Sequence, residues 1–335
     1  MVTPSPKSDT RAASVEQRST HMADNNPSSG AGRQVATSPY GPDDQIGRLN
    51  LMTARSRAEV IANIDASRMF DLSVDYFIGM PSWQLIGDPP YQIWMTHTPS
   101  GNVLEGLPGI AREMTEYISY SGDAMTMYTH TGTHIDTLNH YGYHGSIYNN
   151  FTEKEHLGSR HWRVSGADKM PPIVARGILL DFAALRGVDM LPDRYGITPE
   201  DVEECLAAQG VEIRLGDVVL VRTGRMRAWP DAEQWGENPP GLTRAAAVHL
   251  VESGAMIVGS DTMCVEQGPS ADPDNYTPVH TYLLAEAGAP LIEVLDLEEL
   301  AESRVYEFGF FAACLRLRGA TGSPLRPWAF PYRQE

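Results

Sequence analysis

The sequence contains few cysteines and no long apolar run, and these absences exclude several classes of protein. Only Cys205, Cys264 and Cys314 occur among 335 residues, and no two of them form a C-x-x-C pair. Neither a disulfide framework nor a cysteine zinc site is therefore expected. No run approaches the roughly 18 apolar residues of a membrane span, and the N-terminus lacks the apolar segment of a secretory signal. We expect a cytoplasmic protein with no membrane partner.

Positive charge is also scarce. The chain has 26 Lys and Arg against 43 Asp and Glu, which gives a formal net charge of -17. A surface this acidic repels phosphate backbones, so a nucleic-acid partner is not expected. Hydrophobic residues make up 42% and charged residues 21% of the chain, which is ordinary globular usage.

The composition changes near residue 38. Residues 1–38 are rich in Ser, Pro, Asn and Gly and have almost no apolar periodicity. Such a segment cannot offset the conformational entropy lost on ordering, so we predict a disordered tail over 1–38. No repeat and no linker-like stretch follows, and 39–335 is predicted to be a single domain.

Strand and helix patterns alternate through this domain. Short apolar runs predict buried strands at 177–182, 217–222 and 255–259. A helix-like run covers 54–64, and two further helices are predicted to start after Thr198 and Thr243 and to end at Gly210 and Gly254. The fold class is therefore α/β.

Six of the ten histidines lie between positions 130 and 161. Within this stretch His130, His134 and Asp136 offer two imidazole nitrogens and one carboxylate in seven residues. These ligand types suit zinc, manganese or iron. The segment therefore predicts a metal site.

The spacing of these residues also predicts the local backbone. On a straight strand His130 and His134 would be about 13 Å apart, too far for one ion. A helix would align them but would point Asp136 elsewhere, and Thr-Gly-Thr is poor helix material. A bend at Gly132 is predicted instead, because glycine adopts positive φ without steric cost. His140 would then lie nearby as an unligated proton carrier.

Other interpretations apply to the remaining candidates. Histidines taken singly are more often polar loop or core residues, and we assign His144, His156 and His161 to that class. Aromatic residues at 83, 94, 120 and 141–148 could line a pocket, although core packing is the commoner role. Without a Gly-x-Ser-x-Gly elbow, an acyl-enzyme route is less favoured.

The pattern His-x-Gly-Thr-His-x-Asp-x3-His resembles the signature of the cyclase-like metal-dependent hydrolases, which include bacterial kynurenine formamidase and isatin hydrolase. The resemblance implies a swivelling β/β/α domain that forms a homodimer or homotetramer. It assigns the metal to His130, His134 and Asp136, and acid/base catalysis to His140. It also makes His280 and Glu293 candidates for a second metal or its remnant.

The resemblance implies a divalent Zn or Mn cofactor and a small-molecule carbonyl substrate. The expected reaction is hydrolysis of a cyclic amide, imide or lactone, or of an N-formyl amide. The alternatives are a metal-dependent lyase or cyclase and a non-catalytic metal-binding protein. One departure is the run Thr137-Leu138-Asn139, where many family members have a proline. The substrate is therefore not transferred from either named enzyme.

Overall fold

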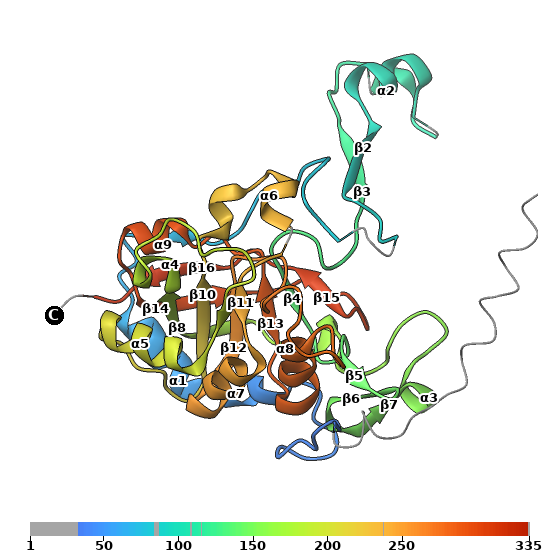
Figure 1. Cartoon of the computed structure of the whole chain (residues 1–335). Coiled ribbons are helices and arrows are strands. Elements are labelled where there is room, and N and C mark those ends of the chain that lie inside the picture. The colour runs from blue at the N-terminus through green and yellow to red at the C-terminus, as the bar shows by residue number, and fades with distance from the viewer. Residues whose placement is uncertain (1–32, 84–86, 108, 115, 237, 334–335) are drawn as a thin grey trace, which may run out of the picture. The chain divides into compact units, whose positions relative to one another are not determined.

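The computed structural model describes residues 33–83, 87–107, 109–114, 116–236 and 238–333 (Figure 1). Residues 1–32 of the predicted tail lie outside the described residues. The described end of that tail contacts the domain. Ala36 donates its backbone N–H to Ala285 O over 2.9 Å, and the Ser38 N–H donates to Asn149 Oδ1 over 3.0 Å.

A nine-stranded mixed sheet runs through the domain. Its central strands β8, β10, β12 and β13 are parallel, and antiparallel strands extend both edges. In spatial order the strands are β1 (Phe70–Asp71), β16 (Trp328–Pro331), β14 (Glu307–Ala312), β8 (Ile173–Asp181), β10 (Asp217–Arg222), β12 (Ala255–Ser260), β13 (Leu291–Glu293), β4 (His134–Asp136) and β15 (Gly322–Pro324).

The central strands are mostly apolar because both faces of the sheet are buried. Ile178 and Leu180 of β8 belong to one core, together with side chains of α5 (Pro199–Gln209) and α7 (Arg244–Ser253). Leu179 lies between them in the sequence and packs on the other face, with Phe308 and Leu49. The three predicted strands correspond to β8, β10 and β12, and the predicted α/β class is confirmed.

The predicted helix ends are also confirmed. Thr198 caps α5 by accepting a hydrogen bond from the Asp201 N–H, and Gly210 ends the helix with φ of 68°. Thr243 caps α7 in the same way, and Gly254 follows it with φ of 128°. The run at 54–64 forms α1 (Ala54–Asn63).

Smaller elements surround the sheet. They are β5 (Gly142–Tyr143), β6 (Ser146–Ile147), β7 (Phe151–Thr152), α3 (Glu153–His156), α4 (Phe182–Leu185), β9 (Gly196–Ile197), α6 (Ala232–Gly236), β11 (Gly241–Leu242), α8 (Pro278–His280) and α9 (Glu298–Glu302). A π-helical turn, Thr281–Ala287, follows α8. Among the described helices, none combines the length and apolar character that crossing a bilayer requires.

One part of the domain stands apart from the main sheet. Strands β2 (Gln92–His97) and β3 (Gly122–Thr126) pair with each other as a separate two-stranded ribbon, and α2 (Pro99–Glu105) follows β2. Figure 1 shows the ribbon extending away from the sheet. We call residues 88–128 the arm.

Candidate metal centre

The predicted ligands lie near one edge of the main sheet. His134 and Asp136 are two residues apart on β4, so their side chains leave the same face of the strand. Strand β13 runs antiparallel beside β4 and places Glu293 directly opposite His134. All three side chains are buried. Strand pairing thus brings together residues separated by about half the chain.

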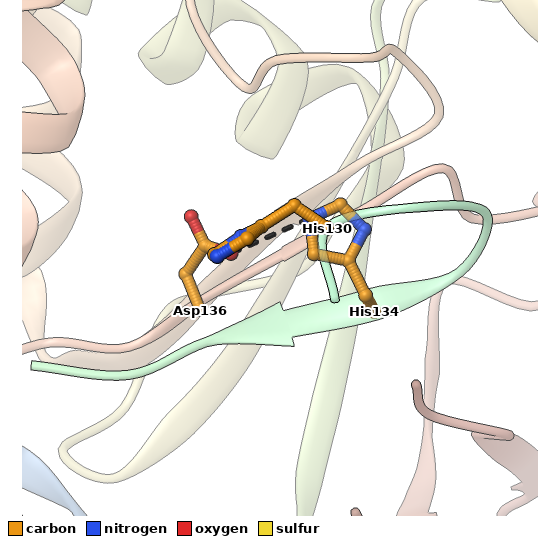
Figure 2. A group of neighbouring side chains, drawn as sticks. All are labelled: His130, His134 and Asp136. Atoms are coloured by element: carbon orange, nitrogen blue, oxygen red, sulfur yellow. Dashed lines mark hydrogen bonds and ion pairs between the residues drawn. The ribbon is translucent and has the colours of Figure 1, made fainter. Parts of the chain in front are cut away.

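Gly132 turns the backbone so that His130 returns toward the strand. Its φ is +60°, and a Cβ at this position would lie 2.8 Å from Cζ of Tyr76. The predicted bend is therefore confirmed. Figure 2 shows the outcome, in which His130 Nδ1 lies 2.6 Å from Asp136 Oδ1. The other ring nitrogen, Nε2, is 2.9 Å from Thr321 Oγ1.

The orientation of His134 is fixed by its own loop. Its Nδ1–H donates to the carbonyl oxygen of Gly132 over 2.7 Å. Its Nε2 therefore faces two carboxylates, 3.3 Å from Asp136 Oδ1 and 3.2 Å from Glu293 Oε2. A backbone acceptor on one imidazole nitrogen is the usual arrangement when the other nitrogen binds a metal.

His280 joins the group from the end of α8. Its Nε2 lies 3.1 Å from Glu293 Oε1 and 3.8 Å from Asp136 Oδ2. Its Nδ1 is hydrogen-bonded to Glu266, a buried carboxylate that also accepts from the backbone N–H groups of Val279 and His280. Sequence reasoning missed Glu266, since no motif or spacing distinguishes it from other glutamates.

His140 lies at the more open side of the group. Its ring stacks on His130 with centroids 3.9 Å apart, and its Nε2 is 3.5 Å from Asp136 Oδ2. The side chain is 19% exposed, whereas those of His130 and His134 are nearly closed to solvent. Burial lowers the pKa of His140, Asp136 opposes this, and His130 and His280 lower it further. The imidazole is therefore neutral near pH 7 and can accept a proton.

The electrostatics of the centre favour a cation. Burial would lower the pKa of His134, but Asp136 and Glu293 outweigh it and raise the pKa to about 10. Within the described residues, His134 Nε2, Asp136 Oδ2 and Glu293 Oε1 are buried and make no hydrogen bond. Buried polar atoms without partners are unfavourable unless an ion or proton joins them.

The donor atoms also converge closely enough for metal ligation. Ligand atoms of His130, His134 and Asp136 all lie within 4.8 Å of one another, and so do those of Asp136, His280 and Glu293. Nitrogen and oxygen donors of this kind suit zinc or manganese. The residues present therefore fit a divalent ion, and Asp136 belongs to both groups.

Comparison with known proteins places the chain in a family. Residues 70–267, more than half of the chain, match the Cyclase family model, described as "Putative cyclase". The chain belongs to this cyclase family. The matched segment contains all of β4 and His140, while His280 and Glu293 follow it.

Two solved structures and one further protein resemble the chain over most of its length. One is described as the crystal structure of a novel cyclase. Its sequence is 28% identical to this chain, its TM-score is 0.77, and the match covers 87% of this chain and 96% of the other. Cyclase-like protein 3 of Oryza sativa subsp. japonica is 26% identical over 77% of this chain and 78% of its own. Isatin hydrolase A from Labrenzia aggregata, bound to benzyl benzoate, shares the fold at 21% identity and a TM-score of 0.60, covering 79% and 94% of the two chains.

Of the other histidines and aromatic residues considered as candidates, some lie at the metal centre and others lie elsewhere in this cyclase-family chain. Tyr141 lies beside the centre, with its ring 4.6 Å from that of His140 and 5.1 Å from that of His280. Tyr148 is buried in the core. The other candidates lie elsewhere: His144 and His161 are exposed, His156 bonds to Thr152, and Trp94 and Tyr120 are on the arm.

Proposed function

We propose that this cyclase-family chain is a metal-dependent hydrolase that holds a divalent Zn or Mn ion through His130, His134 and Asp136. The observation that carries the proposal is the convergence of these three side chains, whose ligand atoms lie within 4.8 Å of one another, with His134 Nε2 and Asp136 Oδ2 buried and without a hydrogen bond. Buried carboxylate and imidazole groups that converge in this way are stabilised by a bound cation.

The second group, formed by Asp136, His280 and Glu293, supports a second ion in the proposal. Asp136 would be shared, because Oδ1 faces His130 and His134 while Oδ2 faces His140 and His280. Metal analysis of the purified protein distinguishes one ion from two.

When bound, a divalent ion supplies Lewis acidity, which polarises a carbonyl and makes water nucleophilic near neutral pH. The chain's own contribution to the reaction is proton transfer. The His140 side chain is partly exposed, its Nε2 lies near Asp136 Oδ2, and its lowered pKa keeps it unprotonated before the reaction. We assign it to take a proton from the attacking water and to return it to the leaving nitrogen or oxygen.

We propose a small carbonyl compound as substrate: a cyclic amide, imide or lactone, or an N-formyl amide. Tyr141 and Tyr276 form an aromatic wall next to His140 and His280, with their rings 6.4 Å apart. Such a wall suits a flat substrate with an apolar face. The fold shared with an isatin hydrolase supports the same class, because isatin contains a cyclic amide.

The test is a screen of formyl amides, imides and lactones with protein stripped by EDTA and then reloaded with Zn or Mn. We expect turnover to disappear on stripping and to return with metal. Turnover that survives complete metal removal would refute the proposal. A metal-loaded protein that converts none of these compounds would favour the non-catalytic alternative.

A further inference from the structure

A cavity of about 620 Å³ lies near the edge of the main sheet that is farther from the metal centre. Its walls come from the chain after α1, the chain after α9 and the end of β16, which pairs with the edge strand β1. Strand β4, which carries His134 and Asp136, is second from the opposite edge of the sheet. The cavity is therefore separate from the metal centre. Its volume falls in the range of about 300–1,000 Å³ that is usual for small-molecule sites.

Positive charge gathers on the walls of this cavity. They include Arg68, Arg304 and Arg333, and Asp65 is the one acidic side chain among the described lining residues. Three arginines and one aspartate give the lining a formal charge of +2, whereas the whole chain carries -17. All three arginines are exposed. A local patch of this sign attracts small anions, while the acidic surface around it repels long polyanions such as nucleic acids.

The three arginines of the cavity have no acidic partner in the described part of the chain. None of them forms an ion pair with a carboxylate there, whereas Arg176 pairs with both Asp217 and Glu307. The Asp65 carboxylate instead accepts a hydrogen bond from the Ser67 N–H over 3.0 Å. Like charges that share a cavity repel one another, so an anion bound between them replaces this repulsion with attraction.

Two of the guanidinium groups are already oriented by the chain itself. Arg68 Nη2 donates to Ser303 Oγ over 3.1 Å, and the guanidinium carbon lies 5.0 Å from the centre of the Phe70 ring. Arg333 Nε donates to the carbonyl oxygen of Ile64 over 3.0 Å. Each of these hydrogen bonds uses one of the five N–H donors of a guanidinium, so the others remain for a ligand. Donors that are oriented before binding lower the entropy cost of holding a ligand.

We infer that this cavity is a second binding site, which takes a small organic oxyanion with two or more negative charges, such as a phosphate monoester or a dicarboxylate. The planar guanidinium fork matches the oxygens of both groups. The cavity is larger than a free phosphate ion fills, and Tyr332 adds aromatic surface to its wall, so the ligand carries an organic body. The inference does not depend on the proposed hydrolase activity.

The test is titration calorimetry of the full chain with glucose 6-phosphate, glutarate and inorganic phosphate as separate probes. We expect wild-type protein to bind one equivalent of the phosphate monoester or the dicarboxylate. The double variant Arg304→Gln/Arg333→Gln is expected to bind it about tenfold more weakly or worse, because it loses two charged donors. Both side chains are exposed, so the variant is expected to fold. Arg318→Gln is the matched control, since Arg318 is exposed and does not line the cavity.

Three outcomes would overturn the inference. Equal affinity in wild-type protein and the double variant would place the anion elsewhere, for example at the metal centre. The absence of binding of all three probes at millimolar concentration and low salt, where the attraction between exposed charges is strongest, would leave no site. Inorganic phosphate that binds as tightly as the phosphate monoester would contradict the organic part of the ligand.

Discussion

Among the single residues of the metal centre, Asp136 is the carboxylate that lies close to all four histidines. Its Oδ1 lies 2.6 Å from His130 and 3.3 Å from His134, and its Oδ2 lies 3.5 Å from His140 and 3.8 Å from His280. Burial raises the pKa of this carboxyl, but the neighbouring histidines outweigh burial and hold it well below its usual value. Asp136 is therefore an anion that can serve two cations.

Alanine substitutions are expected to separate ligation from proton transfer. His134→Ala removes a buried donor that faces two carboxylates, so the variant is expected to lose its metal. His140→Ala is expected to keep its metal and to lose turnover about 10²–10⁴-fold, the usual contribution of a general acid/base. Elemental analysis and kcat of both proteins check this. Equal metal loss in the two variants would contradict the division of roles.

Glu266 is expected to position His280 rather than to bind the ion. Because Glu266 holds His280 Nδ1, the Nε2 atom is left facing Glu293. Glu266→Gln weakens this hold, and metal affinity at the second group is expected to fall about 10–100-fold while the first group remains loaded. Titration calorimetry with Zn measures both steps. Glu286→Gln is the control, since Glu286 bonds to Tyr143 and Arg244 and not to His280. Unchanged zinc binding in Glu266→Gln would contradict the positioning role of Glu266.

Among the structural elements, the loop before β4 determines the geometry of the metal centre. Gly132→Ala places a Cβ 2.8 Å from the Tyr76 ring in a left-handed backbone conformation. We expect lower stability and loss of metal. Gly187→Ala is the control, because Gly187 has φ of +65° with no atom within 4 Å of the added Cβ. Gly187→Ala is expected to lose only the cost of the left-handed backbone conformation, about 1–2 kcal/mol in the free energy of unfolding. Urea unfolding of both variants checks this, and equal effects would contradict it.

A buried ionic cluster joins β8, β10 and α9. Arg222 bonds to Asp181 over 2.7 Å and to Glu298 over 2.8 Å, and the Arg222 and Asp181 side chains are about 5% exposed or less. Arg222→Met leaves Asp181 without its partner, so we expect a loss of about 3–5 kcal/mol in the free energy of unfolding. Arg55→Met removes an exposed pair with Glu59 and is expected to change the free energy of unfolding little. Urea unfolding curves compare the two, and a stable Arg222→Met protein would contradict the expectation.

Across the whole molecule, the sequence predicts those features of the fold that depend on local chemistry. Caps, stops and apolar runs locate α5, α7 and the central strands, because each depends on residues close together in the chain. The order of the nine strands depends on pairings between distant segments, such as β13 with β4. No local pattern specifies such pairings.

The same distinction applies to the site. The bend at Gly132 follows from ligand spacing within seven residues, so it is predictable from the residues themselves. His280 and Glu293 were reached through family resemblance, and the structure places both beside Asp136. Glu266 and Thr321 lie far from the motif in sequence and contact it only after folding. The arm is missed for another reason: its apolar residues resemble core until the fold leaves them exposed.

The most direct test of the central claim is the product mass after reaction in ¹⁸O-labelled water with the metal-reloaded protein. Hydrolysis at the His130, His134 and Asp136 centre predicts that a cyclic substrate gains one water, and that the new carboxylate, or the formate released from an N-formyl amide, carries one ¹⁸O. A product that gains no water and no label would contradict the account and favour lyase or cyclase chemistry at the same centre.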